Sequence, residues 1–141
     1  LNELGNTRTE SNLISIVPTM LRGVFNCDSL LEKMKSMRCI ILGGEMAHRF
    51  IVEKCLEYNL KIFISYGLTE TCSGVCGYWV TSNSYIEGSS GKAFDDVKIE
   101  IDDNENIMIF SDVVMKGYYR KSINDKKHWA KWVWFEGPKQ K

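Results

Sequence analysis

A stretch of six residues, 66–71, combines an aromatic ring, a glycine, two hydroxyl groups and a carboxylate in the order YGLTET. Tyr66 offers a flat ring on which a base can stack, and Gly67 allows the backbone to approach a ligand closely. Thr69 can hydrogen-bond a phosphate oxygen, and Glu70 can bind a hard cation such as Mg²⁺. These residue types together suit a magnesium nucleotide.

The residues before this stretch predict a parallel sheet. Short apolar runs at 13–17, 39–42 and 62–64 predict buried strands. Segments 29–37 and 47–58 have apolar residues at helical spacing and predict helices between the strands. Strands that alternate with helices imply parallel strands joined by right-handed crossovers. The fold class is therefore α/β, with the doubly wound pattern.

Two local patterns predict how these helices begin and which side they bury. Ser29 followed by Glu32 is a capping-box pattern, so the first helix is predicted to start at residue 29. The second helix is predicted to bury one apolar stripe. That stripe consists of Ala47, Phe50, Ile51, Cys55 and Tyr58.

The candidate binding residues follow two of the predicted strands. Gly43-Gly44-Glu45 comes directly after the strand at 39–42, and Tyr66 follows a strand expected to end near Ser65. In an open parallel sheet, ligands bind beyond the carboxyl ends of the strands. Both segments are therefore predicted at the same edge of the sheet.

The chain after Tyr66 predicts mainly β structure. Helical spacing is lost, and glycines divide the sequence into short pieces. Segments 97–101 and 107–110, separated by a turn at 102–104, predict a β-hairpin. A parallel βαβ layer is thus followed by a mainly β portion.

Composition excludes several classes of partner and site. Lys plus Arg and Asp plus Glu number 18 each, so no net field favours nucleic acid. No apolar run approaches the length of about 20 residues that a membrane span needs. The five cysteines are an odd number, which favours a reducing, cytoplasmic location over a disulfide framework. Cys72 and Cys76 have no matching partners for a metal site.

The motifs occur in the order found in the adenylate-forming superfamily of acyl-CoA synthetases, luciferases and peptide-synthetase adenylation domains, which residues 13–120 resemble. Tyr66, Gly67, Thr69 and Glu70 match its fifth core motif, Tyr-Gly-x-Thr-Glu. Other matching segments are Gly43-Gly44-Glu45, Gly88-Ser89-Ser90-Gly91-Lys92 and Val114-Met115-Lys116-Gly117-Tyr118-Tyr119. By this resemblance the chain is an internal part of the superfamily's large domain, with an AMP-binding α/β part at 13–74 and a mainly β part at 75–120.

The resemblance also implies roles for single residues. Tyr66 would stack on adenine, Thr69 would contact the α-phosphate, and Glu70 would bind Mg²⁺. Thr69 and Glu70 are accordingly the predicted catalytic residues. The adenine pocket would be lined by Gly43, Gly44, Glu45, Tyr66 and Gly67.

The implied activity is that of an AMP-forming acid–CoA ligase. Such an enzyme uses ATP and Mg²⁺ to activate a carboxylic acid as an acyl-adenylate, with coenzyme A as co-substrate. The string Thr71-Cys72-Ser73 after the core motif is similar to o-succinylbenzoate–CoA ligase of menaquinone biosynthesis. A fatty-acid or other carboxylate–CoA ligase and a non-catalytic nucleotide-binding remnant remain alternatives.

Several parts of the superfamily have no counterpart in the sequence. These are the phosphate loop, the Thr-Gly-Asp segment and the C-terminal domain with its lysine. The chain begins at Leu1 rather than Met, residues 1–12 are a polar lead-in, and residues 121–141 form a divergent tail. We therefore expect a truncated or frameshifted piece that lacks the remainder of the enzyme and is inactive alone.

Overall fold

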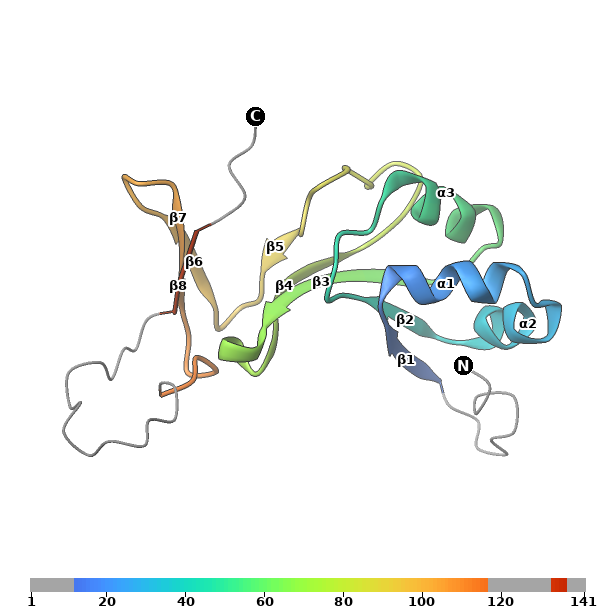
Figure 1. Cartoon of the computed structure of the whole chain (residues 1–141), viewed down its shortest axis with the longest axis horizontal. Coiled ribbons are helices and arrows are strands. Elements are labelled where there is room, and N and C mark those ends of the chain that lie inside the picture. The colour runs from blue at the N-terminus through green and yellow to red at the C-terminus, as the bar shows by residue number, and fades with distance from the viewer. Residues whose placement is uncertain (1–11, 117–132, 137–141) are drawn as a thin grey trace.

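The structure, a computed structural model, describes residues 12–116 and the backbone of residues 133–136 (Figure 1). The helical elements are α1 (Pro18–Phe25), α2 (Asp28–Ser36), α3 (Arg49–Glu57) and the 3₁₀ turn η1 (Thr69–Thr71). One sheet has the order β1 (Leu13–Ile16), β2 (Cys39–Leu42), β3 (Ile62–Leu68), β4 (Ser73–Trp79) and β5 (Lys92–Ala93). A second sheet has the order β6 (Lys98–Ile101), β7 (Asn106–Phe110) and β8 (Val133–Glu136).

The three predicted parallel strands are confirmed. Strands β1, β2 and β3 pair in parallel, with Ile14 opposite Ile40 and Ile40 opposite Ile62. Their apolar side chains alternate between the two faces of the sheet, as the period of two in a strand requires. One face carries Ile16, Ile40, Leu42, Ile62 and Ile64, and these residues share a core with all three helices. Among the described residues, the helices thus gather on a single face, whereas the predicted doubly wound pattern has helices on both faces (Figure 1).

Helix α1 was not predicted from the sequence. It begins at Pro18, which is favoured in the first turn because the missing N–H has no partner there in any helix. Its own residues Leu21 and Val24, three positions apart, are fully buried. This helical spacing is hard to recognise in the sequence, because the helix has 8 residues and contains Gly23, a poor helix former.

Two predictions for the other helices were wrong in detail. Helix α2 has Cys27 as its N-cap, with no side-chain cap, so Ser29 and Glu32 do not form the predicted capping box. Helix α3 buries Ile51, Val52 and Cys55, whereas Phe50 is 58% exposed. Phe50 lies on the opposite side because each residue advances about 100° around a helix.

The predicted end of β3 was also wrong. The strand does not stop near Ser65 but continues to Leu68, because β4 returns beside it in the antiparallel direction. The pairing contains a register shift between Tyr66 and Gly67. The parallel layer is therefore extended by an antiparallel ribbon that carries the YGLTET stretch.

The second half contains the predicted hairpin. Strands β6 and β7 are antiparallel, with Ile99 opposite Ile109. Asp102 closes the turn, because its Oδ1 accepts hydrogen bonds from the backbone N–H groups of Asn104 and Asn106. Val75 from β4 joins Val97 and Ile109 in a small second core. The mainly β second half is thus confirmed.

Part of the predicted organisation falls outside this description. Residues 1–11 of the lead-in, residues 117–119 of the last matching segment and most of the tail are outside the described residues. The exception in the tail is β8, which pairs with β7 along the backbone.

The longest described helices, α2 and α3, have 9 residues each, and no described helix meets the length and hydropathy of a membrane span.

Candidate functional site

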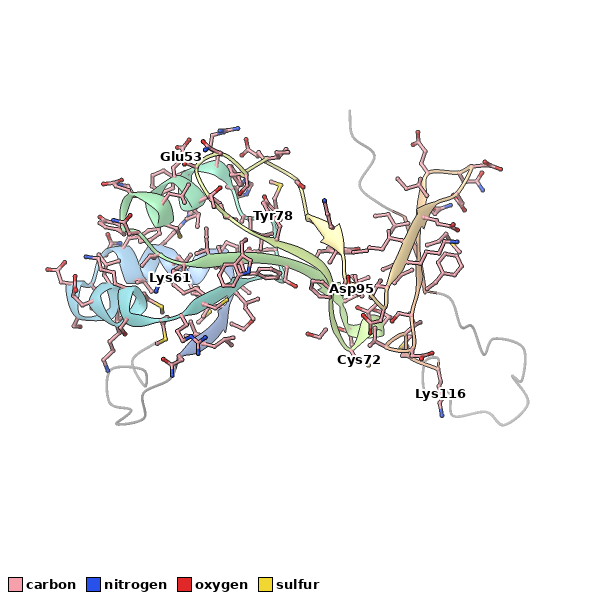
Figure 2. The ribbon with its side chains drawn as sticks, turned by 180° about the vertical axis from the view of Figure 1, so that it is seen from behind. Glu53, Lys61, Cys72, Tyr78, Asp95 and Lys116 are labelled. Atoms are coloured by element: carbon pink, nitrogen blue, oxygen red, sulfur yellow. The ribbon has the colours of Figure 1, made fainter. Side chains whose placement is uncertain are left out.

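The YGLTET stretch forms the end of β3 and a single 3₁₀ turn. After Leu68 the chain enters η1, and Cys72 then reverses it into β4 with a left-handed backbone, φ 58°. The N–H of Cys72 donates to the carbonyl of Thr69 at 3.1 Å. Figure 2 shows Cys72 at the tip of the β3–β4 ribbon, where the first sheet meets the hairpin. The turn therefore lies at the junction of the two halves.

The side chain of Thr71 closes this turn from inside. It is 1% exposed, and its Oγ1 accepts a hydrogen bond from the N–H of Leu68 at 2.9 Å. The same oxygen lies 3.0 Å from the carbonyl of Leu68 and 2.8 Å from that of Ser73, so its proton has an acceptor on either strand. One buried hydroxyl thus connects the end of β3 to the start of β4.

A distant segment holds the same turn from outside. The N–H of Met115 donates to the carbonyl of Glu70 at 2.7 Å. Met115 follows β7, and its neighbours Val113 and Val114 pack against the second core. The position of the Glu70 backbone is therefore coupled to the hairpin.

A pocket of about 440 Å³ opens beside η1 at the carboxyl ends of β2 and β3. It contains five of the predicted site residues: Gly43, Gly44, Gly67, Thr69 and Glu70. Thr69 is exposed and Glu70 is half-buried. The rule that ligands bind at the carboxyl edge of parallel strands correctly brought these two segments together.

Two glycines are required by this geometry. Gly44 has φ 81°, a left-handed conformation that side chains rarely adopt, and it reverses the chain after β2. A Cβ at Gly67 would overlap the carbonyl oxygen of Ser73 on the neighbouring strand. The floor of the pocket is consequently formed by closely spaced backbone.

Two predicted residues, Tyr66 and Glu45, are not in the lining of this pocket. Tyr66 packs against the second core, and burial raises the pKa of its hydroxyl. The exposed Glu45 uses Oε1 to accept a hydrogen bond from the N–H of Thr19, in the first turn of α1, at 2.7 Å. This bond holds the pKa of Glu45 below its usual value. Their roles toward a nucleotide remain predictions.

The pocket also contains residues that the sequence analysis missed. These are Ser15, Ile41, Ser65, Leu68, Ser73 and Gly74. Ser15 and Ile41 are opposite each other on β1 and β2, on the sheet face away from the helices. Strand alternation could have found them, since their neighbours Ile16 and Leu42 are core residues.

The site offers a limited set of ligands to a cation. No group of three or more His, Cys, Asp or Glu side chains in the described part of the chain could hold a metal ion. Glu70 is the carboxylate of the pocket lining. Mg²⁺ bound with a nucleotide typically uses one or two protein carboxylates together with phosphate oxygens and water. The lining fits that mode and not an all-protein cage.

Comparison with known proteins gives consistent results. The family model described as AMP-binding enzyme matches residues 7–119. The 2-succinylbenzoate–CoA ligase of Bacillus subtilis (strain 168) is 36% identical over 140 residues, covering 89% of this chain and 28% of that protein. The same-named enzyme of Lactococcus lactis subsp. lactis (strain IL1403) is 31% identical over 112 residues, covering 76% and 24%.

A solved structure is similar over the same region. It is the O-succinylbenzoate coenzyme A synthetase of Bacillus subtilis in complex with ATP and magnesium ion. The TM-score is 0.67 at 34% sequence identity, over 89% of this chain and 28% of that chain. The chain thus spans between a fifth and a third of the length of the relatives it matches.

Proposed function

Because the chain belongs to the AMP-binding enzyme family, we propose that it forms part of an ATP-dependent, AMP-forming acid–CoA ligase. The observation that carries this proposal is the pocket at the carboxyl ends of β2 and β3. It gathers the double glycine, Thr69 and Glu70 within one lining. This lining suits a nucleotide. Its glycine backbone can face a base, the Thr69 hydroxyl can bind a phosphate, and the Glu70 carboxylate can bind a cation.

The proposed reaction has two steps. A carboxylate oxygen of the acid attacks the α-phosphorus of ATP, and the bond to pyrophosphate breaks. The sulfur of coenzyme A then attacks the acyl carbon, and AMP leaves. In the first step Glu70 would hold Mg²⁺, which neutralises charge on the phosphates, and the exposed Thr69 hydroxyl would donate to a phosphate oxygen.

The proposed acid is o-succinylbenzoate, which would place the intact enzyme in menaquinone biosynthesis. The support is that the relatives described above are ligases for this acid. Of the string Thr71-Cys72-Ser73, which predicts this acid, only Ser73 lines the pocket and could contact the acid directly. A fatty-acid ligase is the alternative, and comparing kcat/KM for the two acids in a protein that contains all catalytic segments would decide.

We further propose the organisation and location that the sequence predicts. Residues 13–120 would form a partial AMP-binding domain, with the α/β part at 13–74 and the mainly β part at 75–120. All five cysteines are free thiols. This favours a reducing location such as the cytoplasm.

Nucleotide titration of the 141-residue chain tests the proposal. We expect saturable ATP binding that Mg²⁺ strengthens, and we expect Glu70→Gln to remove the Mg²⁺ effect while ATP alone still binds. The amide of Gln keeps the shape of the side chain but loses the charge that attracts the cation. Calorimetry with and without Mg²⁺ measures both quantities.

Glu53→Gln is the matched control, because Glu53 is an exposed carboxylate on α3, remote from the tip of the β3–β4 ribbon (Figure 2). It should bind as the wild type does. The proposal is wrong if the chain binds no ATP at millimolar concentration. The assignment of Glu70 is wrong if Glu70→Gln responds to Mg²⁺ as Glu53→Gln does.

A further inference from the structure

Thr71 lies next to two proposed site residues but does not line the pocket. Thr69 and Glu70 line the pocket, whereas Thr71 is 1% exposed and is absent from the lining. Its hydroxyl is within hydrogen-bonding distance of three backbone groups, belonging to Leu68 and Ser73. Thr71 therefore has no free group with which to recognise an acid.

The turn that carries Glu70 depends on contacts with the rest of the chain. It is a single 3₁₀ turn of three residues, and such short turns are not stable by themselves. Its hydrogen bonds to the rest of the chain include those of the Thr71 hydroxyl and the bond from Met115 to the Glu70 carbonyl. The first set fixes the turn to both strands, and the second fixes it to the hairpin.

We propose that Thr71 is a positioning residue, whose buried hydroxyl ties β3 to β4 across η1 and so aims the Thr69 and Glu70 side chains into the pocket. The expected effect of Thr71 on nucleotide binding rests on the proposed function. The geometric part stands on the contacts of Leu68, Thr71 and Ser73 alone.

The physical reason lies in the position of the hydroxyl. The Leu68 N–H donates to it, so removing the oxygen leaves this donor without that partner at a part-buried position. An unpaired buried polar group is costly, because it has given up its hydrogen bonds to water without keeping a partner in the protein. The chain can relieve the cost by letting η1 rearrange, and that movement displaces Glu70.

Thr71 has a different role from the one that its place in the sequence predicts. The sequence places it in the string Thr71-Cys72-Ser73, which predicts the acid substrate. In the structure it serves the geometry of the metal and phosphate end of the site, and Ser73 is the member of that string that faces the pocket. Replacing Thr71 should therefore alter the response to Mg²⁺ and leave the choice of acid unchanged.

The experiment compares Thr71→Val, Thr71→Ser and the wild type in the 141-residue chain. Val keeps the shape but removes the hydroxyl, while Ser keeps the hydroxyl. Thr81→Val is the matched control, because the Thr81 hydroxyl also accepts a backbone N–H, from Ser84 at 3.2 Å, in a turn outside the pocket lining. Amide hydrogen exchange and ¹⁵N relaxation by NMR report on the turn, and ATP titration with and without Mg²⁺ reports on the site.

In Thr71→Val we expect the Leu68 amide to exchange about tenfold faster or more, with increased motion of the Thr69 and Glu70 amides. The Mg²⁺ enhancement of ATP binding should fall, while binding without Mg²⁺ stays the same. Thr71→Ser should restore both readouts. Thr81→Val should change neither.

The outcomes separate this inference from the proposed function. If no variant binds ATP but the Leu68, Thr69 and Glu70 amides respond as expected, the proposed function fails and the positioning role stands. If those amides are unchanged in Thr71→Val, the inference is overturned. It is also overturned if Thr71→Val and Thr71→Ser lose the dispersed spectrum of the whole chain alike, because the residue would then serve the fold and not the turn.

Discussion

Among the described residues, segment 13–64 packs three helices against one face of the first sheet, whereas the hairpin of β6 and β7 packs against the end of the β3–β4 ribbon (Figure 1). The first core draws fully buried residues from every helix and from β2 and β3. The second core has Val75, Val97 and Ile109 as its buried members. Figure 1 shows the two regions at opposite ends of the β3–β4 ribbon.

The proposed site lies where these two regions meet. The α/β region supplies the strand ends and the glycine turn, and the hairpin region supplies the Met115 bond to the backbone of Glu70. A region with few buried contacts opens at lower free energy than a large core. One wall of the pocket therefore belongs to the large first core, and the other depends on the half with the small core.

Shortening a buried side chain in the first core should destabilise the protein most. Ile62, in the central strand of the first core, is 0% exposed. We expect Ile62→Ala to lower the free energy of unfolding by about 3–4 kcal/mol, because it removes buried methyl groups and leaves a cavity. Urea denaturation followed by circular dichroism measures this. Ile101→Ala is the control, since Ile101 is 72% exposed and its loss should cost less than about 0.5 kcal/mol.

Ile109→Ala makes the corresponding change in the second core, where the side chain is also 0% exposed. We expect faster amide exchange in β6, β7 and η1, with unchanged exchange in β1 and β2. Hydrogen exchange with mass spectrometry gives the comparison for each segment. If β1 and β2 exchange faster as well, the two regions unfold as one unit and the distinction between them disappears.

The parallel strands could be predicted because each is short and rich in apolar residues, as strands of parallel sheets usually are. Helix ends were harder. The capping-box pattern at Ser29 failed because the N-cap of α2 is Cys27, two residues earlier, and the helix begins at Asp28. Where α2 begins depends on how α1 and α2 pack together, and this packing cannot be read from a local sequence pattern.

The site was predictable where it follows from strand ends and not where it follows from pairing between strands. Gly43, Gly44 and Thr69 were found because they succeed predicted strands. Ser65 and Gly74 were not predicted, because they line the pocket where β4 pairs with β3, and this pairing could not be read from the sequence. The hydrogen bond from the N–H of Met115 to the carbonyl of Glu70 could not be predicted. The two residues are far apart in the sequence, and neither side chain takes part.

A second, intermediate effect concerns the cysteines of the two regions. Cys55 is fully buried in the first core, and burial raises its thiol pKa to about 12. Cys72 is exposed at the tip of the turn. Because the thiolate is the reactive form, we expect iodoacetamide at about pH 8 to label Cys72 rapidly and Cys55 only after unfolding. Peptide mass spectrometry over time measures both rates, and equal rates would show that the first core is not closed.

The pKa of Cys55 also predicts a dependence of stability on pH. The folded state keeps the proton up to about pH 12, whereas the unfolded thiol begins to release it near its ordinary value of 9.0. The unfolded state is thus favoured as the pH rises between these values. Cys55→Ala should flatten this part of the stability profile. Cys72→Ala, as the matched variant, should leave it unchanged.

The smallest expected effect is at Glu45, at the rim of the first core. Its carboxylate accepts the N–H of Thr19 at the start of α1, where the first backbone donors of a helix lack partners. This hydrogen bond to the charged form is the main cause of its lowered pKa. A lowered pKa in the folded state means that the carboxylate contributes stability above its ordinary pKa, and that the contribution is lost as the pH falls through the folded value.

Glu45→Gln should therefore lower the urea midpoint slightly at about pH 7, and the difference from the wild type should shrink toward about pH 3. Glu57→Gln is the control, because the Glu57 carboxylate pairs with Lys54 and caps no helix. If Glu45→Gln instead weakens ATP binding at unchanged stability, Glu45 belongs to the nucleotide site after all. The pocket would then extend beyond Gly44 to the first turn of α1, and the helix cap would be a feature of the ligand-free chain.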